Sequence, residues 1–209
     1  MKCSIVDIHT HRPTGKALEP SFAGIHPWQA ETRRIEEIVP RFGEVDLVGE
    51  IGLDYAGTVG REAQLRIFRE QLDWAERLGK PVVLHCVKAF EAVMRELAPH
   101  ALRAVIFHGF IGSSQQAAEA IKKGYYLSFG ERTFRSPRTV EALRRTPVEN
   151  LFAETDESDV PIEEIYRRIA QAKDLDPELL KCAIYRNYRE IFALSLIHIS
   201  EPTRRSYIS

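Results

Sequence analysis

The N-terminal stretch "IVDIHTHRP" carries three ionisable side chains directly after a run of apolar residues. Asp7, His9 and His11 are spaced two apart, so in a strand their side chains would point to the same side. Two imidazoles at this spacing can bind one divalent cation, but a histidine on a strand can equally be a hydrogen-bonded core residue. The pair alone leaves both interpretations open. Asp7 fits a partner that fixes a histidine tautomer better than it fits a ligand.

Four more residues of the same chemical types follow apolar runs, at points where a strand would give way to a loop: Glu50, His85, His108 and Asp156. In a barrel of parallel strands the carboxyl ends share one mouth, so these residues would converge. Ionisable groups on apolar strands are costly to bury without partners, whereas divalent cations use imidazole lone pairs and neutralise carboxylates. We therefore expect a site for two divalent ions, with these ligands: His9, His11, Glu50, His85, His108 and Asp156.

The mixture of imidazole and carboxylate ligands suits Zn²⁺, Mn²⁺ or Fe²⁺, and Mg²⁺ fits if water and phosphate oxygens complete the site. Six ligands are more than one tetrahedral ion needs. A glutamate such as Glu50 can bridge two ions roughly 3.5–4 Å apart, as two-metal hydrolytic sites require.

The elements that would position these residues are short apolar runs alternating with amphipathic stretches, which is typical of an α/β fold with a parallel sheet. We expect seven strands, over residues 3–11, 21–27, 47–55, 81–87, 104–110, 125–130 and 150–156. Helices are predicted over residues 61–80, 113–124, 160–175 and 177–194. The stretch 12–20 is too short for a helix, so one crossover is expected to be missing there.

The composition is that of an ordinary globular protein of 209 residues, with 28 % charged residues and a net charge of −1. This balance excludes a dedicated basic surface for nucleic acid, so a phosphate-bearing substrate would need a local binding feature. No apolar run reaches the roughly 18–20 residues of a membrane span. We expect one domain over residues 1–193 and a non-native tail over 194–209, which includes His198.

Cysteine usage and the N-terminus favour a cytoplasmic protein. Cys3, Cys86 and Cys182 are widely spaced and odd in number, which predicts reduced buried thiols rather than a disulfide framework. The segment after Met1 turns polar by Asp7, unlike a signal peptide. No membrane association and no obligate protein partner are expected.

The motifs "DIHTH", "GIHPW", "GEIGLDY", "VVLH", "FHGFIGS" and "AETD", in this order, resemble the TatD family of metal-dependent deoxyribonucleases in the amidohydrolase superfamily. The resemblance runs from about residue 4 to 192. It implies a TIM-like (β/α) barrel, seven-stranded here, with one β/α unit missing after strand 1. It also implies hydrolysis of phosphodiester bonds in DNA, in the manner of an exonuclease, by a metal-activated water.

The resemblance also assigns roles to the site residues. His9, His11, Glu50 and Asp156 would surround one ion, while Glu50, His85 and His108 would hold the second. Glu50 and Asp156 would be the catalytic carboxylates, Glu50 as the bridge and Asp156 as the base that orients or deprotonates the attacking water.

The chain departs from the family pattern where substrate would bind. A helix and a strand are absent between the first two motifs, Cys86-Val87-Lys88 replaces the frequent Ser-Arg-Asp, and Glu157-Ser158 replaces Ala-Pro. We expect His26, Lys88 and Asp54 to contact substrate at the mouth. Trp28 could pack at the rim or stack on bases, and the sequence favours packing.

Two other functions remain open on the sequence alone. The same dinuclear site could cleave an ester or amide, for example in a D-aminoacyl-tRNA or a small cyclic amide, as the near-neutral surface and shortened mouth would allow. The protein could also be a metal-binding or partner-binding module without activity, although such a module would not need to keep an open metal site.

Overall fold

Six strands running in the same direction form the centre of the fold, in a computed structural model that describes residues 3–192. The sheet order follows the chain, and every neighbouring pair is parallel. The strands are β1 (Phe22–Ala23), β2 (Leu47–Asp54), β3 (Val82–Val87), β4 (Val105–Phe107), β5 (Tyr126–Phe129) and β6 (Leu151–Ala153).

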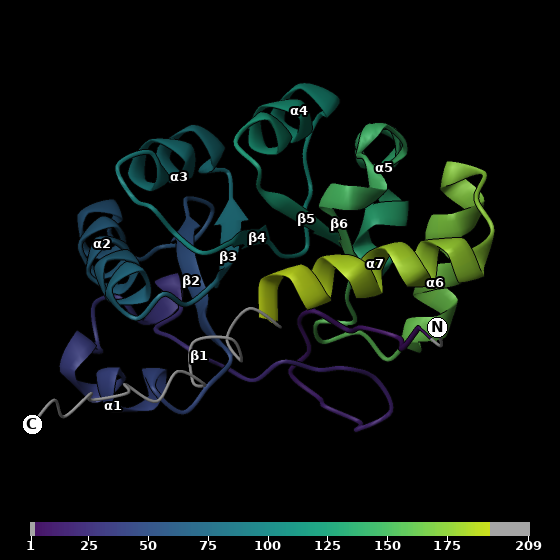
Figure 1. Ribbon diagram of the computed structural model, residues 1–209. Coiled ribbons are helices and arrows are strands. Elements are labelled where there is room, and N and C mark those ends of the chain that lie inside the picture. Colours follow the sequence, from purple (N-terminus) through teal and green to yellow (C-terminus); the bar gives the residue numbers. More distant parts are fainter. Residues whose placement is uncertain (1–2, 193–209) are drawn as a thin grey trace, which may run out of the picture.

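The helices lie outside the sheet, where α2 to α6 form an arc around the strands and α7 crosses in front of them (Figure 1). Their bounds are α1 (Val39–Phe42), α2 (Arg61–Arg77), α3 (Phe90–Leu97), α4 (Ser114–Lys122), α5 (Pro137–Arg145), α6 (Ile162–Lys173) and α7 (Pro177–Phe192). The four helices expected from the sequence are therefore confirmed over the described residues. Ser113 caps α4 by accepting a hydrogen bond from the backbone N–H of Gln116, and the sequence predicted this start.

The first expected strand is not a strand of this sheet, so the prediction of seven strands is wrong by one. Residues 5–11 run extended beside β6, where the Ile8 N–H donates to the Ala153 carbonyl at 3.1 Å. On its other side the segment meets Leu18 through the Asp7 N–H at 2.9 Å. Its bridges to neighbouring residues are isolated ones, between Val6 and Leu18 and between Thr10 and Asp156. Residues 12–20 hold no helix, as expected.

Burial along the strands explains their apolar sequences. All eight residues of β2 are buried, and the buried apolar side chains of strands and helices form one cluster. This agrees with strands covered on both faces. The expected end of the domain at residue 193 and the tail over 194–209 lie outside the described residues.

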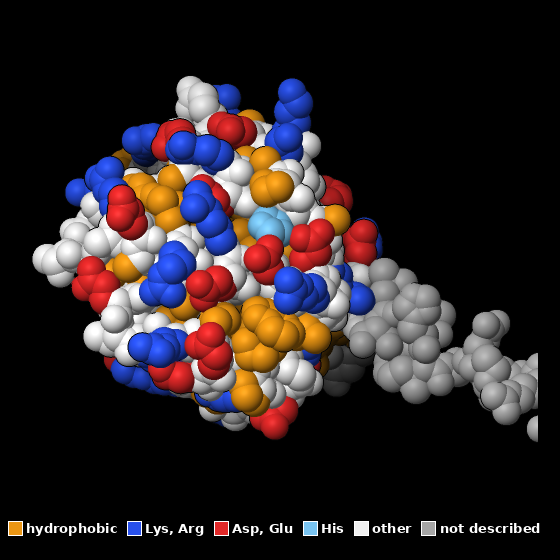
Figure 2. Space-filling model, turned by 90° about the vertical axis from the view of Figure 1, so that its left-hand side faces the viewer, with side chains coloured by type: hydrophobic (Ala, Val, Ile, Leu, Met, Phe, Trp, Pro, Cys, Tyr) orange, Lys and Arg blue, Asp and Glu red, His pale blue; other side chains and the backbone are white. Residues whose placement is uncertain are grey.

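The surface carries charges of both signs. Figure 2 shows acidic and basic side chains interspersed over one face, without a large area of a single sign. Across residues 3–192, none of the helices has the length and apolarity that crossing a bilayer would require.

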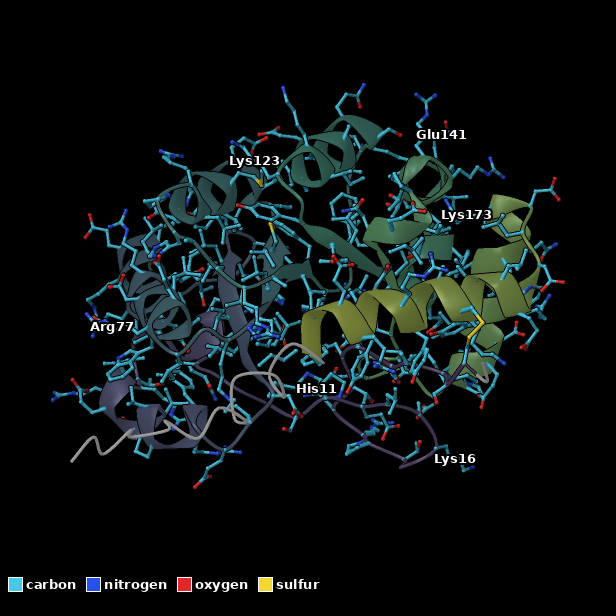
Figure 3. The ribbon with its side chains drawn as sticks, viewed as in Figure 1. His11, Lys16, Arg77, Lys123, Glu141 and Lys173 are labelled. Carbon is cyan, nitrogen blue, oxygen red and sulfur yellow. A yellow bond between two sulfur atoms is a disulfide. The ribbon has the colours of Figure 1, made fainter. Side chains whose placement is uncertain are left out.

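The cysteines correct the prediction of reduced thiols. Cys3 and Cys182 form a disulfide across 179 residues, visible as the yellow bond beside α7 in Figure 3. Only Cys86 is free, and burial raises the pKa of its thiol to about 12. An odd number of cysteines still allows one disulfide, because the fold brings the N-terminal segment with Cys3 to Cys182 in α7. The cytoplasmic localisation stays a prediction, without the support that reduced thiols would have given it.

The disulfide predicts that Cys182→Ser lowers the free energy of unfolding by about 2–5 kcal/mol under non-reducing conditions, because the unfolded chain gains freedom. Urea unfolding of wild type and variant measures this difference. With reductant present the two proteins should unfold alike. Titration of the unfolded wild type without reductant should find one thiol, and three thiols would contradict the pairing.

Candidate metal centre

The carboxylate of Glu50 lies at the middle of the site, and its Oε1 atom faces three imidazoles. His108 Nε2 lies 2.6 Å from Oε1, His85 Nδ1 lies 2.7 Å away, and His26 Nε2 lies 3.4 Å away. These groups come from β2, from β3, and from the ends of β4 and β1. Glu50, His85 and His108 were expected together from the sequence, whereas His26 was expected to contact substrate.

The other oxygen of Glu50 faces the N-terminal segment. Oε2 lies 3.5 Å from His9 Nε2 and 3.4 Å from His11 Nε2. The Asp156 Oδ1 atom lies 3.8 Å and 3.7 Å from the same two nitrogens. All six residues expected as ligands therefore meet at one place, in two groups that share Glu50. That they hold metal ions stays a prediction.

The strand β2 is irregular next to Glu50. The pairing of β2 with β3 shifts register between Val48 and Ile51, which turns the intervening residues. A Cβ on Gly49 would lie 2.1 Å from Val83 Cγ1, and one on Gly52 would lie 2.0 Å from the His85 carbonyl oxygen. Gly52 also has a φ of +137°. The two glycines flanking Glu50 therefore allow β2 to approach β3 closely.

Asp156 is fixed by its backbone. Its φ of +55° lies in the left-handed region, a conformation that costs a non-glycine residue about 1–3 kcal/mol. Its N–H donates to the His9 carbonyl at 3.0 Å, and its carbonyl accepts from the His11 N–H at 3.1 Å. These two bonds hold the Asp156 carboxylate beside both imidazoles.

Asp54 lies beside the ring of His85. Its side chain is buried and accepts hydrogen bonds from Trp28 Nε1 at 2.8 Å and from the backbone N–H groups of Ala56 and Gly57. Its Oδ2 also lies 3.0 Å from His85 Nε2. Its oxygens are engaged by these groups, which places Asp54 to orient the His85 ring toward Glu50. A substrate contact of Asp54 stays a prediction.

The other expected substrate residues divide between two cavities. His26 lines the cavity that contains Glu50, and its Nδ1 accepts a hydrogen bond from the Trp28 N–H. Lys88 is exposed and lines a neighbouring cavity that borders His108. The sequence did contain a clue to His26 as a ligand, because it ends an apolar run as the other histidines do.

Glu154 supports His108 from behind. It is buried, and its Oε1 lies 3.5 Å from His108 Nδ1. Burial disfavours the imidazolium form of His108, but hydrogen bonding to Glu154 and Glu50 outweighs it and raises the pKa of His108 to about 10. Burial, together with the neighbouring Glu154 charge, raises the pKa of the Asp156 carboxyl. Hydrogen bonding to Glu50 raises the pKa of His11.

Unsatisfied nitrogens show that the site fits cations. His9 is fully buried, yet neither of its ring nitrogens makes a hydrogen bond to a described residue. Leaving such groups unpaired costs about 1–3 kcal/mol each. A divalent ion among His9, His11 and Asp156, or among His26, Glu50 and His85, would use lone pairs that are within 4.8 Å of one another.

The site opens into a cavity of about 410 Å³. His11 is the most exposed of the imidazoles that face Glu50, and it lies on the N-terminal segment near the loop that carries Lys16 (Figure 3). Arg41 and Arg132 also line the cavity, and neither makes an ion pair with a described residue. The cavity therefore combines a ligand-rich floor with unpaired guanidinium groups.

A parallel α/β sheet with imidazoles and carboxylates gathered at one mouth is the arrangement of TIM-barrel-like proteins. The model of the TatD related DNase family matches residues 16–193, and the chain belongs to this family.

Relatives agree with this assignment. The chain is 35 % identical over 141 residues to a putative deoxyribonuclease TATDN1 homolog of Encephalitozoon cuniculi, covering 65 % of this chain and 50 % of the relative. It is 30 % identical over 206 residues to the 3′-5′ ssDNA/RNA exonuclease TatD of Citrobacter rodentium, covering 84 % and 78 %. The crystal structure of the TatD homolog YjjV of Escherichia coli superposes with a TM-score of 0.76 at 25 % identity, covering 84 % and 77 %.

The chain is shorter than these relatives. It spans 50 % of the Encephalitozoon protein and 61 % of Escherichia coli YjjV, a metal-dependent hydrolase to which it is 33 % identical over 69 % of its own length.

The close approach of Gly52 to β3 predicts that Gly52→Ala lowers the free energy of unfolding by about 3 kcal/mol or more, because the new Cβ meets the His85 carbonyl in a strained backbone conformation. Urea unfolding measures the change. Gly124→Ala is the matched control: its φ is also positive, at +77°, but open space surrounds its Cβ, so it should cost about 1–2 kcal/mol. Equal losses in both variants would contradict the packing argument.

Proposed function

We propose that this protein hydrolyses phosphodiester bonds at DNA ends, as an exonuclease-like enzyme that uses two divalent cations, Zn²⁺, Mn²⁺ or Mg²⁺. The observation that supports this most is that the two carboxylate oxygens of Glu50 face different histidines. Oε2 faces His9 and His11, while Oε1 faces His85 and His108. One carboxylate placed between two sets of ligands is what a two-ion hydrolytic site needs.

Each predicted ligand then has a role. His9, His11, Glu50 and Asp156 hold one ion, and Glu50, His85 and His108 hold the second, with His26 as a further candidate on that side. When bound, such ions lower the pKa of water and polarise a phosphoryl oxygen.

Asp156 is the base in this proposal. It accepts the proton of the attacking water, a role open to a carboxylate whose Oδ1 lies beside both His9 and His11. Its fixed backbone beside His9 and His11 keeps the carboxylate at one position. Asp54 and Glu154 lie behind the rings of His85 and His108 and help to keep both rings directed toward Glu50.

Two features favour a nucleic acid over other substrates. Arg41 and Arg132 line the cavity without acidic partners among the described residues, so they can bind phosphates flanking the bond that is cut. The Citrobacter relative is named an exonuclease of single-stranded DNA and RNA. Because the rest of the surface is mixed in charge, these local groups would supply the affinity for phosphate.

Cleavage of an ester or amide is the alternative for the same ligands. A small cyclic amide would not need the arginines, so that alternative differs from the nuclease in its dependence on Arg41 and Arg132. A D-aminoacyl-tRNA carries phosphates that the arginines could also bind. A comparison of phosphodiester, ester and amide substrates at one metal concentration separates them, and absence of any phosphodiester cleavage with Mg²⁺, Mn²⁺ or Zn²⁺ would favour the alternative.

The proposal predicts that Asp156→Asn reduces kcat on a single-stranded oligonucleotide by about a hundredfold or more, because the base is lost. Oligonucleotide degradation with Mn²⁺ measures the rate, and circular dichroism shows whether the fold is kept. Asp159→Asn is the control, since that carboxylate lies near in sequence but is 94 % exposed and, among residues 3–192, pairs only with Arg12. It should retain near-wild-type turnover.

Near-normal turnover in folded Asp156→Asn would rule out its role as base. Wild type treated with a chelator and then dialysed should lose activity and regain it when a divalent metal is added. Activity that persists without metal would contradict the two-ion proposal.

A further inference from the structure

Trp28 lies at the mouth of the cavity, where it packs against His26 at the rim and is also exposed. It lies in the short 3₁₀ helix Pro27–Gln29 and lines the same cavity as Glu50 and His85. Its side chain is 62 % exposed, an unusual position for the largest apolar residue beside a polar site. Burial in the core does not explain why an indole stands here.

The indole is nevertheless held in one orientation. Its Nε1–H donates to Asp54 Oδ2 at 2.8 Å, and Asp54 is itself fixed by the backbone of Ala56 and Gly57. The His26 ring meets the indole at 73° with centroids 4.5 Å apart. A ring anchored by its edge loses little freedom when a ligand binds to it, so it is preorganised for contact.

Neither neighbouring imidazole stacks on Trp28. The His85 ring lies 6.0 Å away at 70°, so both histidines approach the indole at steep angles. With most of the side chain exposed, a face of the ring is open to a planar partner. Offset stacking of flat rings is the contact that an open aromatic face favours.

The open face is also close to the reacting centre. The rings of Trp28 and His85 are neighbours, and His85 Nδ1 lies 2.7 Å from Glu50 Oε1. Arg33 and Arg41 line the same cavity, and Arg41 has no ion-pair partner among residues 3–192. An aromatic face with cationic groups beside it is the combination by which proteins hold single-stranded nucleic acid.

We infer that Trp28 is a stacking platform for one nucleobase of a single-stranded substrate, next to the phosphate that lies over Glu50. This inference rests on the proposed function and adds a specificity-determining residue to it. The base on Trp28 positions the adjacent phosphodiester, so the enzyme distinguishes a nucleotide chain from a phosphodiester without bases.

Binding without turnover tests the contact directly. The chain has two tryptophans, so Trp74→Phe leaves Trp28 as its sole indole. In that background, with Asp156→Asn added to prevent hydrolysis and Mg²⁺ present, oligothymidylate should quench the fluorescence of Trp28. An oligomer of equal length and charge built from abasic nucleotides should not. Equal quenching by both, or none by either, would overturn the stacking role.

Turnover separates stacking from the structural hydrogen bond. A series of oligonucleotides, each with one abasic nucleotide among the three terminal positions, should show one position where loss of the base lowers wild-type kcat/KM about tenfold or more. Trp28→Ala should lower kcat/KM on the intact strand by a similar factor and abolish that dependence. Trp28→Phe keeps an aromatic face without the Nε1–H, so it should retain the dependence on the base.

If Trp28→Ala lowered kcat/KM equally for intact and abasic strands, Trp28 would only anchor Asp54, and the inference would be wrong. If oligothymidylate quenched Trp28 but the abasic oligomer did not, and wild type hydrolysed no phosphodiester, the stacking platform would be supported and the proposed function overturned. Hydrolysis that ignores the abasic substitutions would support the function and overturn the platform.

Discussion

The site depends on one buried carboxylate, that of Glu50, which two groups of histidines share. Glu50 is almost fully buried, and removing a carboxylate from water costs several kcal/mol unless charges or hydrogen bonds replace the lost solvation. Here imidazoles surround both of its oxygens. Because each oxygen faces a different group, Glu50 couples the N-terminal segment to the middle of the sheet. Any cations in the site would strengthen the same coupling.

Several weak local features combine to hold that carboxylate in place. Gly49 and Gly52 let β2 approach β3, and the register shift between Val48 and Ile51 falls at Glu50. The N-terminal segment lacks regular strand pairing, but the Asp156 backbone and the Tyr166 hydroxyl, which donates to the Val6 carbonyl at 2.9 Å, keep it against β6 and α6. His9 and His11, which lie outside the regular strands, are thus held in place by tertiary contacts.

Much of this arrangement could be predicted from the sequence, because polar residues ending apolar runs must share one edge of a parallel sheet. Glu50, His85 and His108 do meet as expected, although Glu50 and His85 lie within β2 and β3 rather than at their ends. Helix patterns located α2, α4, α6 and α7. Prediction from the sequence failed where long-range contacts decide the outcome. Nothing local indicates that Cys3 reaches Cys182 or that residues 5–11 pair only through isolated bridges. From the sequence, Asp54 could equally be a solvated loop charge, because its contacts with Trp28 and His85 exist only in the folded chain.

The measurement that tests the central claim most directly is the number of divalent ions bound per chain. Equilibrium dialysis of the metal-depleted protein against Zn²⁺ or Mn²⁺, followed by elemental analysis, should find two ions in wild type. Glu50→Gln should lose at least one of them, whereas His100→Gln should keep both, because His100 pairs with Glu76 outside the site. Two tightly bound ions that persist in Glu50→Gln, or fewer than two in wild type, would contradict a site built around one shared carboxylate.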